Sequence, residues 1–105
     1  MTARRLVFHP GVEEDLDSIL AYYAERDAAL PGRFRGRLQE QVERIVLFPE
    51  SGAVLFEEYR RVLLKRFPYM AVYVVDDDRI DVLAIVGVRR DPAWIEAAVT
   101  ARGEE

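Results

Sequence analysis

The amino-acid sequence predicts one α+β domain. It is expected to contain an N-terminal strand, an antiparallel helical hairpin packed on a mainly antiparallel four-stranded sheet, and a short C-terminal helix. The first half of the chain carries apolar residues at the i, i+4, i+7 spacing of amphipathic helices, whereas the second half carries short β-rich apolar runs. The links within the second half are too short for crossover connections, which predicts antiparallel pairing. A chain of 105 residues has the length of one domain, so residues 1–105 are assigned to a single unit.

Residues 4–9 are predicted to form a short strand because they are β-rich and end at the turn dipeptide Pro10-Gly11. The apolar period then becomes that of a helix, which we expect from Val12 to Tyr23. Carboxylates crowd the first turns of this helix, where the helix dipole stabilises negative charge. Their spacing matches no metal-ligand motif; they are Glu13, Glu14, Asp15 and Asp17.

A second helix is predicted over residues 33–47, after a break at Pro31-Gly32. Its apolar positions follow the helical period, and its other face is charged. This helix is expected to end at the segment 48–52, because Pro49 and Gly52 are residues that interrupt helices. Two helices joined by so short a link are expected to pack as an antiparallel hairpin.

The remaining strands are expected at residues 59–67, 69–76 and 79–88, with Asp76, Asp77 and Asp78 in the tight turn between the last two. The run "VLAIV" within the last strand is continuously apolar, which is typical of a central strand. Pro92 then begins the final helix, which we expect to bury Trp94 together with Ile95.

The composition excludes several classes of function. The net charge of −4 argues against a general coat for nucleic acid. The chain has no cysteine and only one histidine, His9, so thiolate nucleophiles, disulfides and paired-histidine metal sites are excluded. No apolar run approaches the roughly 18–20 residues that a membrane span needs. We therefore expect a soluble cytoplasmic protein that binds no metal and no cofactor.

One short segment concentrates positive charge in this acidic chain. It is "YRRVLLKRFPY" at residues 59–69, and its cations are Arg60, Arg61, Lys65 and Arg66. Alternation along a strand would place Arg61 and Lys65 on one face and the other two cations on the opposite face. We predict that the face with Arg61 and Lys65 is an open basic surface, suited to phosphate contact or base stacking. Its expected neighbours are Tyr59, Tyr69, Tyr73 and one of Arg89 and Arg90. The alternative is a charged sheet face that only keeps the protein in solution.

The order of several motifs resembles the RelE/ParE toxins of bacterial type II toxin–antitoxin systems. The motifs are "V..DL..I..YYAE" from Val12, "FP..G" from Phe48, "RRVLLKRFPY" from Arg60 with Tyr73, and "VLAIVGVRRDPAW" from Val82. Together they span roughly residues 6 to 94. The "RFPY" and "RRDP" pieces are closer to the ParE branch than to RelE.

The resemblance implies a small protein that arrests growth when free and is silenced by a cognate antitoxin. Antitoxins of this kind end in a flexible tail that lies along the toxin and folds on contact, which predicts a hetero-oligomer. Arginines would anchor the carboxylates of that tail. The resemblance thus implies a partner-binding set: Arg60, Arg61, Lys65, Arg66, Tyr69, Arg89, Arg90 and Trp94.

Two mechanisms divide the family that the sequence resembles. ParE-type members bind DNA gyrase and perform no chemical step of their own, whereas RelE-type members cut messenger RNA on the ribosome. In the second case the candidate catalytic residues are Arg61, Lys65, Tyr73 and Arg90. Many relatives carry a histidine where this chain has Gly87, and its absence favours the ParE mechanism. A third alternative is a non-toxic relative that only binds its antitoxin.

Overall fold

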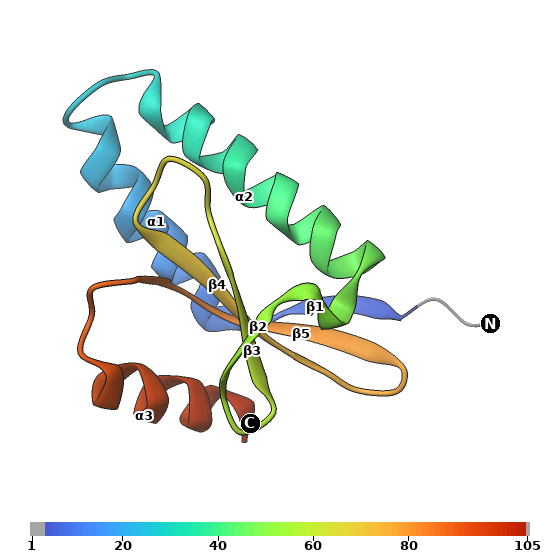
Figure 1. Ribbon diagram of the computed structural model, residues 1–105. Helices are drawn as coiled ribbons and strands as arrows, with labels where there is room; N and C mark the ends of the chain where they lie inside the picture. The colour runs from blue at the N-terminus through green and yellow to red at the C-terminus, as the bar shows by residue number, and fades with distance from the viewer. Residues whose placement is uncertain (1–3, 105) are drawn as a thin grey trace.

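The computed structural model describes residues 4–104, which fold into five strands, three α-helices and one 3-10 turn (Figure 1). The predicted α+β class is confirmed. The elements in chain order are β1 (Arg5–Phe8), α1 (Pro10–Ala24), α2 (Leu30–Leu47), η1 (Pro49–Ser51), β2 (Ala53–Phe56), β3 (Tyr59–Leu63), β4 (Tyr69–Val75), β5 (Arg79–Gly87) and α3 (Pro92–Gly103). No helix among residues 4–104 is both long and apolar enough to cross a membrane.

The sheet has five strands in the order β1-β5-β4-β3-β2, so the predicted count of four is wrong. The strand that the sequence did not predict is β2, whose four residues form a regular strand because they pair antiparallel with β3. The other adjacent pairs are antiparallel except for β1, which runs parallel to β5. The α1–α2 hairpin carries the chain from β1 to β2 at the opposite edge of the sheet, and the antiparallel strands β2 to β5 then bring it back beside β1.

The α1–α2 hairpin covers one face of the sheet, as predicted (Figure 1). Phe34 and Ile45 of α2 are fully buried there, together with Tyr73 of β4. However, α2 begins at Leu30 instead of residue 33. Pro31 lies in the first turn of α2, where the backbone N–H that proline lacks would have no hydrogen-bond partner within the helix. Pro31-Gly32 therefore forms the start of α2 and does not separate the helix from the preceding segment.

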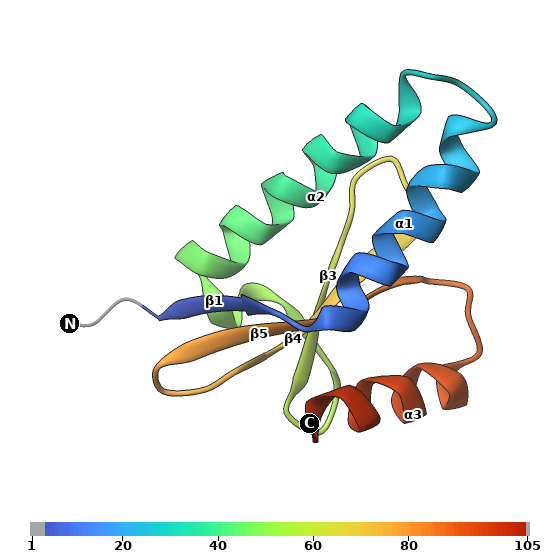
Figure 2. The ribbon, with the colours of Figure 1, turned by 180° about the vertical axis from the view of Figure 1, so that it is seen from behind.

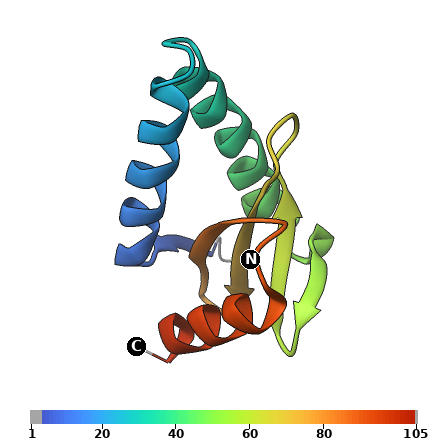
Figure 3. The ribbon, with the colours of Figure 1, turned by 90° about the vertical axis from the view of Figure 1, so that its left-hand side faces the viewer.

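The third helix covers the opposite face of the sheet, so the domain has three layers (Figures 2 and 3). Ile95 and Val99 of α3 pack against Val72 and Leu83 of the sheet. The prediction that Trp94 is buried is wrong, because Ile95 takes that position and 44% of Trp94 is exposed. Burial on both faces explains why the last strand is continuously apolar.

A β-bulge lies at Leu83 in β5, where the pairing with β4 shifts between Val72 and Tyr73. The bulge changes which side of the strand faces each helical layer. Before it, the even-numbered Ile80 and Val82 face the α1–α2 hairpin, whereas after it the odd-numbered Ile85 faces the hairpin and Ala84 and Val86 belong to the core beneath α3. Bulges interrupt the regular ladder and leave backbone groups that need other partners.

Candidate partner-binding groove

The adjacent residues Arg60 and Arg61 of β3 face opposite helical layers. Val62 lies in the core beneath the α1–α2 hairpin, and Arg60 is on the same side of the strand. The Arg60 guanidinium donates hydrogen bonds to the carbonyls of Glu50 (3.2 Å) and Gly52 (2.8 Å). Arg60 therefore holds the segment before β2 against β3.

Arg61 lies within β3, whereas Lys65, which was predicted to share its strand face, lies beyond the end of that strand. β3 ends at Leu63, and the backbone N–H of Leu64 donates to the carbonyl of Tyr69, 3.0 Å away, in the connection to β4. Lys65 follows as an exposed residue in the turn between β3 and β4, and it does not line a groove with Arg61. Arg66 follows with a left-handed φ of 72° and borders a separate hollow of about 520 Å³ beside α2, with Arg33 and Arg37.

Two of the three tyrosines expected beside the basic face are in the core. The Tyr73 hydroxyl donates to the carbonyl of Pro49 (2.6 Å) and accepts from the N–H of Gly52 (3.0 Å), and burial raises its pKa. Tyr59 is buried beneath α3. Because the hydroxyl of Tyr73 is enclosed and hydrogen-bonded to the backbone, Tyr73 has a structural position and does not line an exposed site.

Arg61 and Arg90 are brought together at a groove between the sheet and α3. The groove has a volume of about 390 Å³. Its lining is mainly apolar and comes from β2, β3, β4, the segment after β5, and α3. We name this the α3 groove; its lining residues are Leu55, Phe56, Arg61, Leu63, Met70, Val88, Arg90, Pro92, Ile95 and Glu96.

The α3 groove combines an apolar floor with positive charge at its edge. Its lining includes two exposed large apolar side chains, Leu63 and Val88. The Arg61 side chain makes no hydrogen bond or ion pair with any residue in the described part of the chain. Arg90 stacks on Trp94, with its guanidinium carbon 3.8 Å from the ring centroid, and forms no ion pair within residues 4–104. One carboxylate, Glu96, lines the groove with them.

A second hollow, of about 450 Å³, lies between α1 and the end of β5, and Arg90 and Trp94 border it too. Gly87 and Tyr69 are also in its lining. A Cβ on Gly87 would meet the carbonyl oxygen of Pro68 at 3.8 Å, which is ordinary contact. The surroundings of Gly87 therefore have room for a Cβ atom.

The other residues that the sequence singled out lie outside the α3 groove. His9 caps α1, and its Nδ1 accepts the N–H of Gly11 at 2.9 Å. Arg89 is exposed in the loop after β5 and does not line the α3 groove. The Asp76–Asp78 segment forms the β4–β5 turn, as predicted. Residues 4–104 hold no group of three or more side chains suited to a metal ion.

Sequence reasoning missed most of the groove lining. Leu55 and Phe56 belong to the unpredicted strand β2, and Met70 was visible only as part of an apolar strand. Glu96 and Ile95 enter the groove because α3 packs on the second face of the sheet. Of the lining residues, Arg61 and Arg90 were candidates from the sequence, because each belongs to a pair of adjacent arginines at a predicted strand.

Comparison with known proteins agrees with the motif order. Residues 6–92 match the family described as ParE toxin of type II toxin-antitoxin system, parDE. The chain is 35% identical over 100 residues to proteins named Toxin ParE2 from Mycobacterium tuberculosis strains CDC 1551 / Oshkosh and H37Rv. Each match covers 94% of this chain and 95% of the relative.

A solved structure described as the chromosomal ParDE TA system from P. aeruginosa has the same fold. Its TM-score is 0.71, and the match covers 81% of this chain and 96% of that chain. At 22% identity this likeness concerns the fold alone. The family match over residues 6–92 and the full-length identity to Toxin ParE2 confirm the ParE branch. The chain belongs to the ParE toxin family of type II toxin–antitoxin systems.

Proposed function

We propose that the chain inhibits growth by binding DNA gyrase, and that a cognate antitoxin neutralises it by occupying the α3 groove. The observation that carries the antitoxin site is the combination of exposed apolar lining with two guanidinium groups that have no ion-pair partner among residues 4–104. Contiguous exposed apolar surface in a small domain is typical of a protein–protein interface.

The lining of the α3 groove specifies the chemistry of the bound segment. Its apolar side chains would cover Leu63, Met70 and Ile95, and its carboxylates would accept from Arg61 and Arg90. An amphipathic tail that folds on contact satisfies both requirements. Glu96 repels carboxylates near α3, so the acidic residues of the tail are expected toward Arg61.

A binding mechanism is favoured over RNA cleavage. Cleavage by the RNA's own 2′-hydroxyl needs a proton acceptor and a proton donor beside the cations. In the described part of the chain, the Tyr73 hydroxyl is enclosed and Gly87 brings no imidazole to the corner with Arg90. The family match to ParE supports the same mechanism.

The test of the target uses purified protein. Supercoiling and DNA-cleavage assays with gyrase are expected to respond to the chain, whereas messenger RNA in a translating extract is expected to stay intact. Cleavage of the messenger without an effect on gyrase would refute the gyrase proposal and support the RelE-like alternative. Growth that is unaffected by induced expression would refute toxicity and leave a chain that only binds its antitoxin.

The test of the groove compares arginine variants. Arg61→Ala with Arg90→Ala removes both anchors, and each charge-assisted hydrogen bond contributes about 1.5–3 kcal/mol. We expect the affinity for the antitoxin to fall by at least about tenfold. Arg33→Ala, which removes an exposed arginine beside α2, is the matched control and should bind normally. Equal affinities for the double variant and the control would exclude the α3 groove as the antitoxin site.

A further inference from the structure

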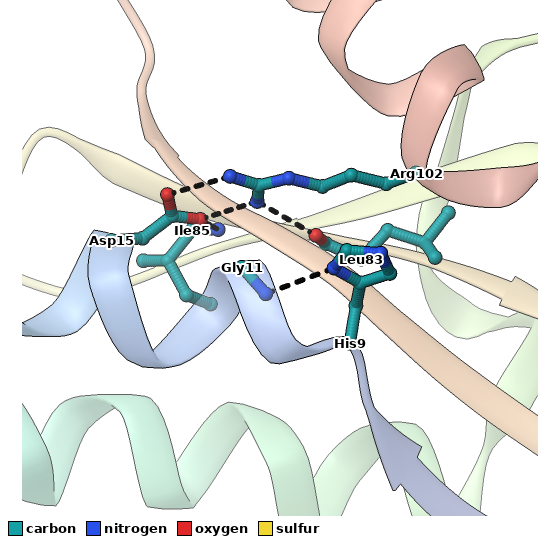
Figure 4. Close-up of polar contacts among 6 residues, drawn as sticks. All are labelled: His9, Gly11, Asp15, Leu83, Ile85 and Arg102. Carbon is teal, nitrogen blue, oxygen red and sulfur yellow. Dashed lines mark hydrogen bonds and ion pairs between the residues drawn. The ribbon is translucent and has the colours of Figure 1, made fainter. Parts of the chain in front are cut away.

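A polar network fixes the last turn of α3 to α1 and β5 (Figure 4). The Arg102 guanidinium reaches from α3 to the carboxylate of Asp15 on α1, with N–O distances of 2.7 and 3.0 Å. Its Nη1 also donates to the carbonyl of Leu83, at 2.9 Å. The Asp15 carboxylate accepts in addition the backbone N–H of Ile85, at 3.0 Å. We call Asp15 and Arg102 the α3 clamp.

The clamp satisfies backbone groups on an open edge of β5. β1 pairs with β5 only as far as Phe8 opposite Val82, and the N–H of His9 closes this ladder on the Val82 carbonyl. The carbonyl of Leu83 and the N–H of Ile85 lie immediately beyond that point, at the bulge. The ion pair thus provides one acceptor and one donor where a neighbouring strand ends. Leaving such buried groups unpaired would be costly.

Two glycines make room for the contacts of the last turn of α3. A Cβ on Gly11 in α1 would lie 2.6 Å from the guanidinium carbon of Arg102. A Cβ on Gly103 would lie 2.5 Å from the hydroxyl of Tyr59 on β3. Both distances are shorter than Cβ contacts in proteins allow, so Gly11 and Gly103 let α3 approach the body closely.

The position of α3 determines the shape of the α3 groove, because α3 contributes one wall. Pro92, Ile95 and Glu96 of that wall lie in the first turns of the helix. Apart from the clamp and the Tyr59 contact, the buried attachment of α3 is Ile95 and Val99. The opposite side of the helix is exposed.

We propose that Asp15 and Arg102 are positioning residues for the α3 groove. By closing the open edge of β5 and fixing the last turn of α3, they hold the helical wall at the distance that suits the bound segment. This inference rests on the proposed function for its binding consequence. The immobilisation of α3 does not depend on that function and can be measured on the chain alone.

Hydrogen exchange of the free chain tests the immobilisation. Arg102→Met keeps the length of the side chain and removes its donors. We expect the amides of α3 and of Ile85 to exchange at least about tenfold faster, while the amides of β4 keep their protection. Unchanged protection of α3 would overturn the proposal. Uniformly faster exchange, including β4, would also overturn it, because the pair would then act on global stability alone.

A charge reversal separates the clamp from a simple ion pair. Asp15→Arg with Arg102→Asp restores the attraction between the two side chains. However, it places a donor against the Ile85 N–H and an acceptor against the Leu83 carbonyl. We therefore expect no recovery of α3 protection, whereas Arg102→Lys should recover part of it because an ammonium can donate to both acceptors. Full recovery by the reversal would overturn the proposal.

Affinity for the antitoxin tests the binding consequence. The probe is a synthetic peptide of the C-terminal tail encoded beside this chain. Gly11→Ala displaces the Arg102 guanidinium without touching the groove, and Gly36→Ala is its control because no neighbouring atom lies within 4 Å of the added Cβ. We expect at least about a tenfold loss of affinity for Gly11→Ala and none for Gly36→Ala. Equal affinities would overturn the positioning role. A native chain that binds no peptide would instead refute the proposed function and leave the exchange result standing.

Discussion

The adjacent arginines Arg60 and Arg61 of β3 have different surroundings. Arg60 and Arg61 differ by one position, and alternation along β3 sends their side chains to opposite helical layers. On one side the guanidinium has two backbone carbonyls as partners. On the other side it has no ion-pair partner among residues 4–104 and lines the α3 groove. The same residue type is therefore structural at position 60 and available for recognition at position 61.

This difference predicts opposite effects of alanine substitution on stability. Arg60→Ala removes two hydrogen bonds from a charged donor, and we expect the free energy of unfolding to fall by about 1.5–3 kcal/mol. Arg61→Ala should change it by no more than about 0.5 kcal/mol, because its side chain has no hydrogen bond or ion pair among residues 4–104 to lose. Urea denaturation of the two variants measures both values. A larger loss for Arg61→Ala than for Arg60→Ala would contradict the assignment.

The buried phenol of Tyr73 makes the free energy of unfolding decrease at alkaline pH. Burial raises the pKa of Tyr73 above the ordinary value of 10.0, and burial also raises the pKa of Tyr59 and Tyr23. A raised pKa means that the folded chain keeps the phenol proton more tightly than the unfolded chain. The stability from these groups is therefore complete below about pH 10 and falls as the pH rises further.

Tyr73→Phe tests this at two pH values. The variant loses the hydrogen bonds to Pro49 and Gly52, and we expect a loss of about 1–3 kcal/mol near pH 8. Since it has one buried phenol fewer, its stability should fall less steeply between about pH 10 and about pH 11 than that of the native chain. If urea denaturation showed the same pH dependence of the free energy of unfolding for the variant and the native chain, the Tyr73 phenol would not contribute to that dependence.

At the scale of elements, α3 decides whether the second face of the sheet is covered. Its buried residues Ile95 and Val99 meet β4 and β5, and its last turn closes on Tyr59. The helix therefore depends on close approach at its C-terminal end and leaves a groove near its N-terminal end.

Gly103→Ala tests this close approach. The added Cβ would come within 2.5 Å of the Tyr59 hydroxyl, so the helix or the ring must shift, and overpacking of this kind costs about 1–3 kcal/mol. Gly32→Ala in α2 is the matched control, because its Cβ meets no atom within 4 Å and alanine is favoured over glycine in a helix by about 1 kcal/mol. Thermal unfolding should show a lower midpoint for Gly103→Ala and an equal or higher one for Gly32→Ala. The reverse order would contradict the packing of α3.

At the scale of the whole molecule, the distribution of charge on the surface is more informative about binding partners than the net charge. The chain carries a net charge of −4, yet it presents Arg61 and Arg90 at one apolar groove. Local cations in an acidic protein favour a small acidic segment over a long polyanion, because the remaining surface repels extended negative charge. This agrees with the proposed antitoxin tail as the occupant.

Salt dependence tests this distribution. We expect the affinity for the antitoxin peptide to fall between about 50 and 500 mM salt, because screening weakens the contacts to the two guanidinium groups. The variant with both arginines replaced by alanine should lose most of this dependence. An affinity of the native chain that does not change with salt would mean that apolar contact alone carries the complex.

Local pattern allowed part of this structure to be predicted. The helical period identified α1 and most of α2, and the short turn of aspartates identified the β4–β5 hairpin. The prediction failed at β2 and at residues 64–67, since a strand of four residues has little pattern of its own and β3 ends where its partner stops pairing. Arg61 and Arg90 were both candidates from the sequence, and the predicted residues Trp94 and Tyr69 lie beside Arg90, whereas Lys65, Tyr59 and Tyr73 do not line the α3 groove.

The sequence by itself determined the fold class and the order of the three helices and of every strand except β2, because helical period, alternation and turn residues act over a few positions along the chain. Only the tertiary structure decided the parallel placement of β1 against β5, the covering of the second sheet face by α3, and the sides on which the arginines emerge. These features depend on contacts between residues far apart in the chain. Clearest among them is Asp15 with Arg102, 87 positions apart, whose meeting no local pattern encodes.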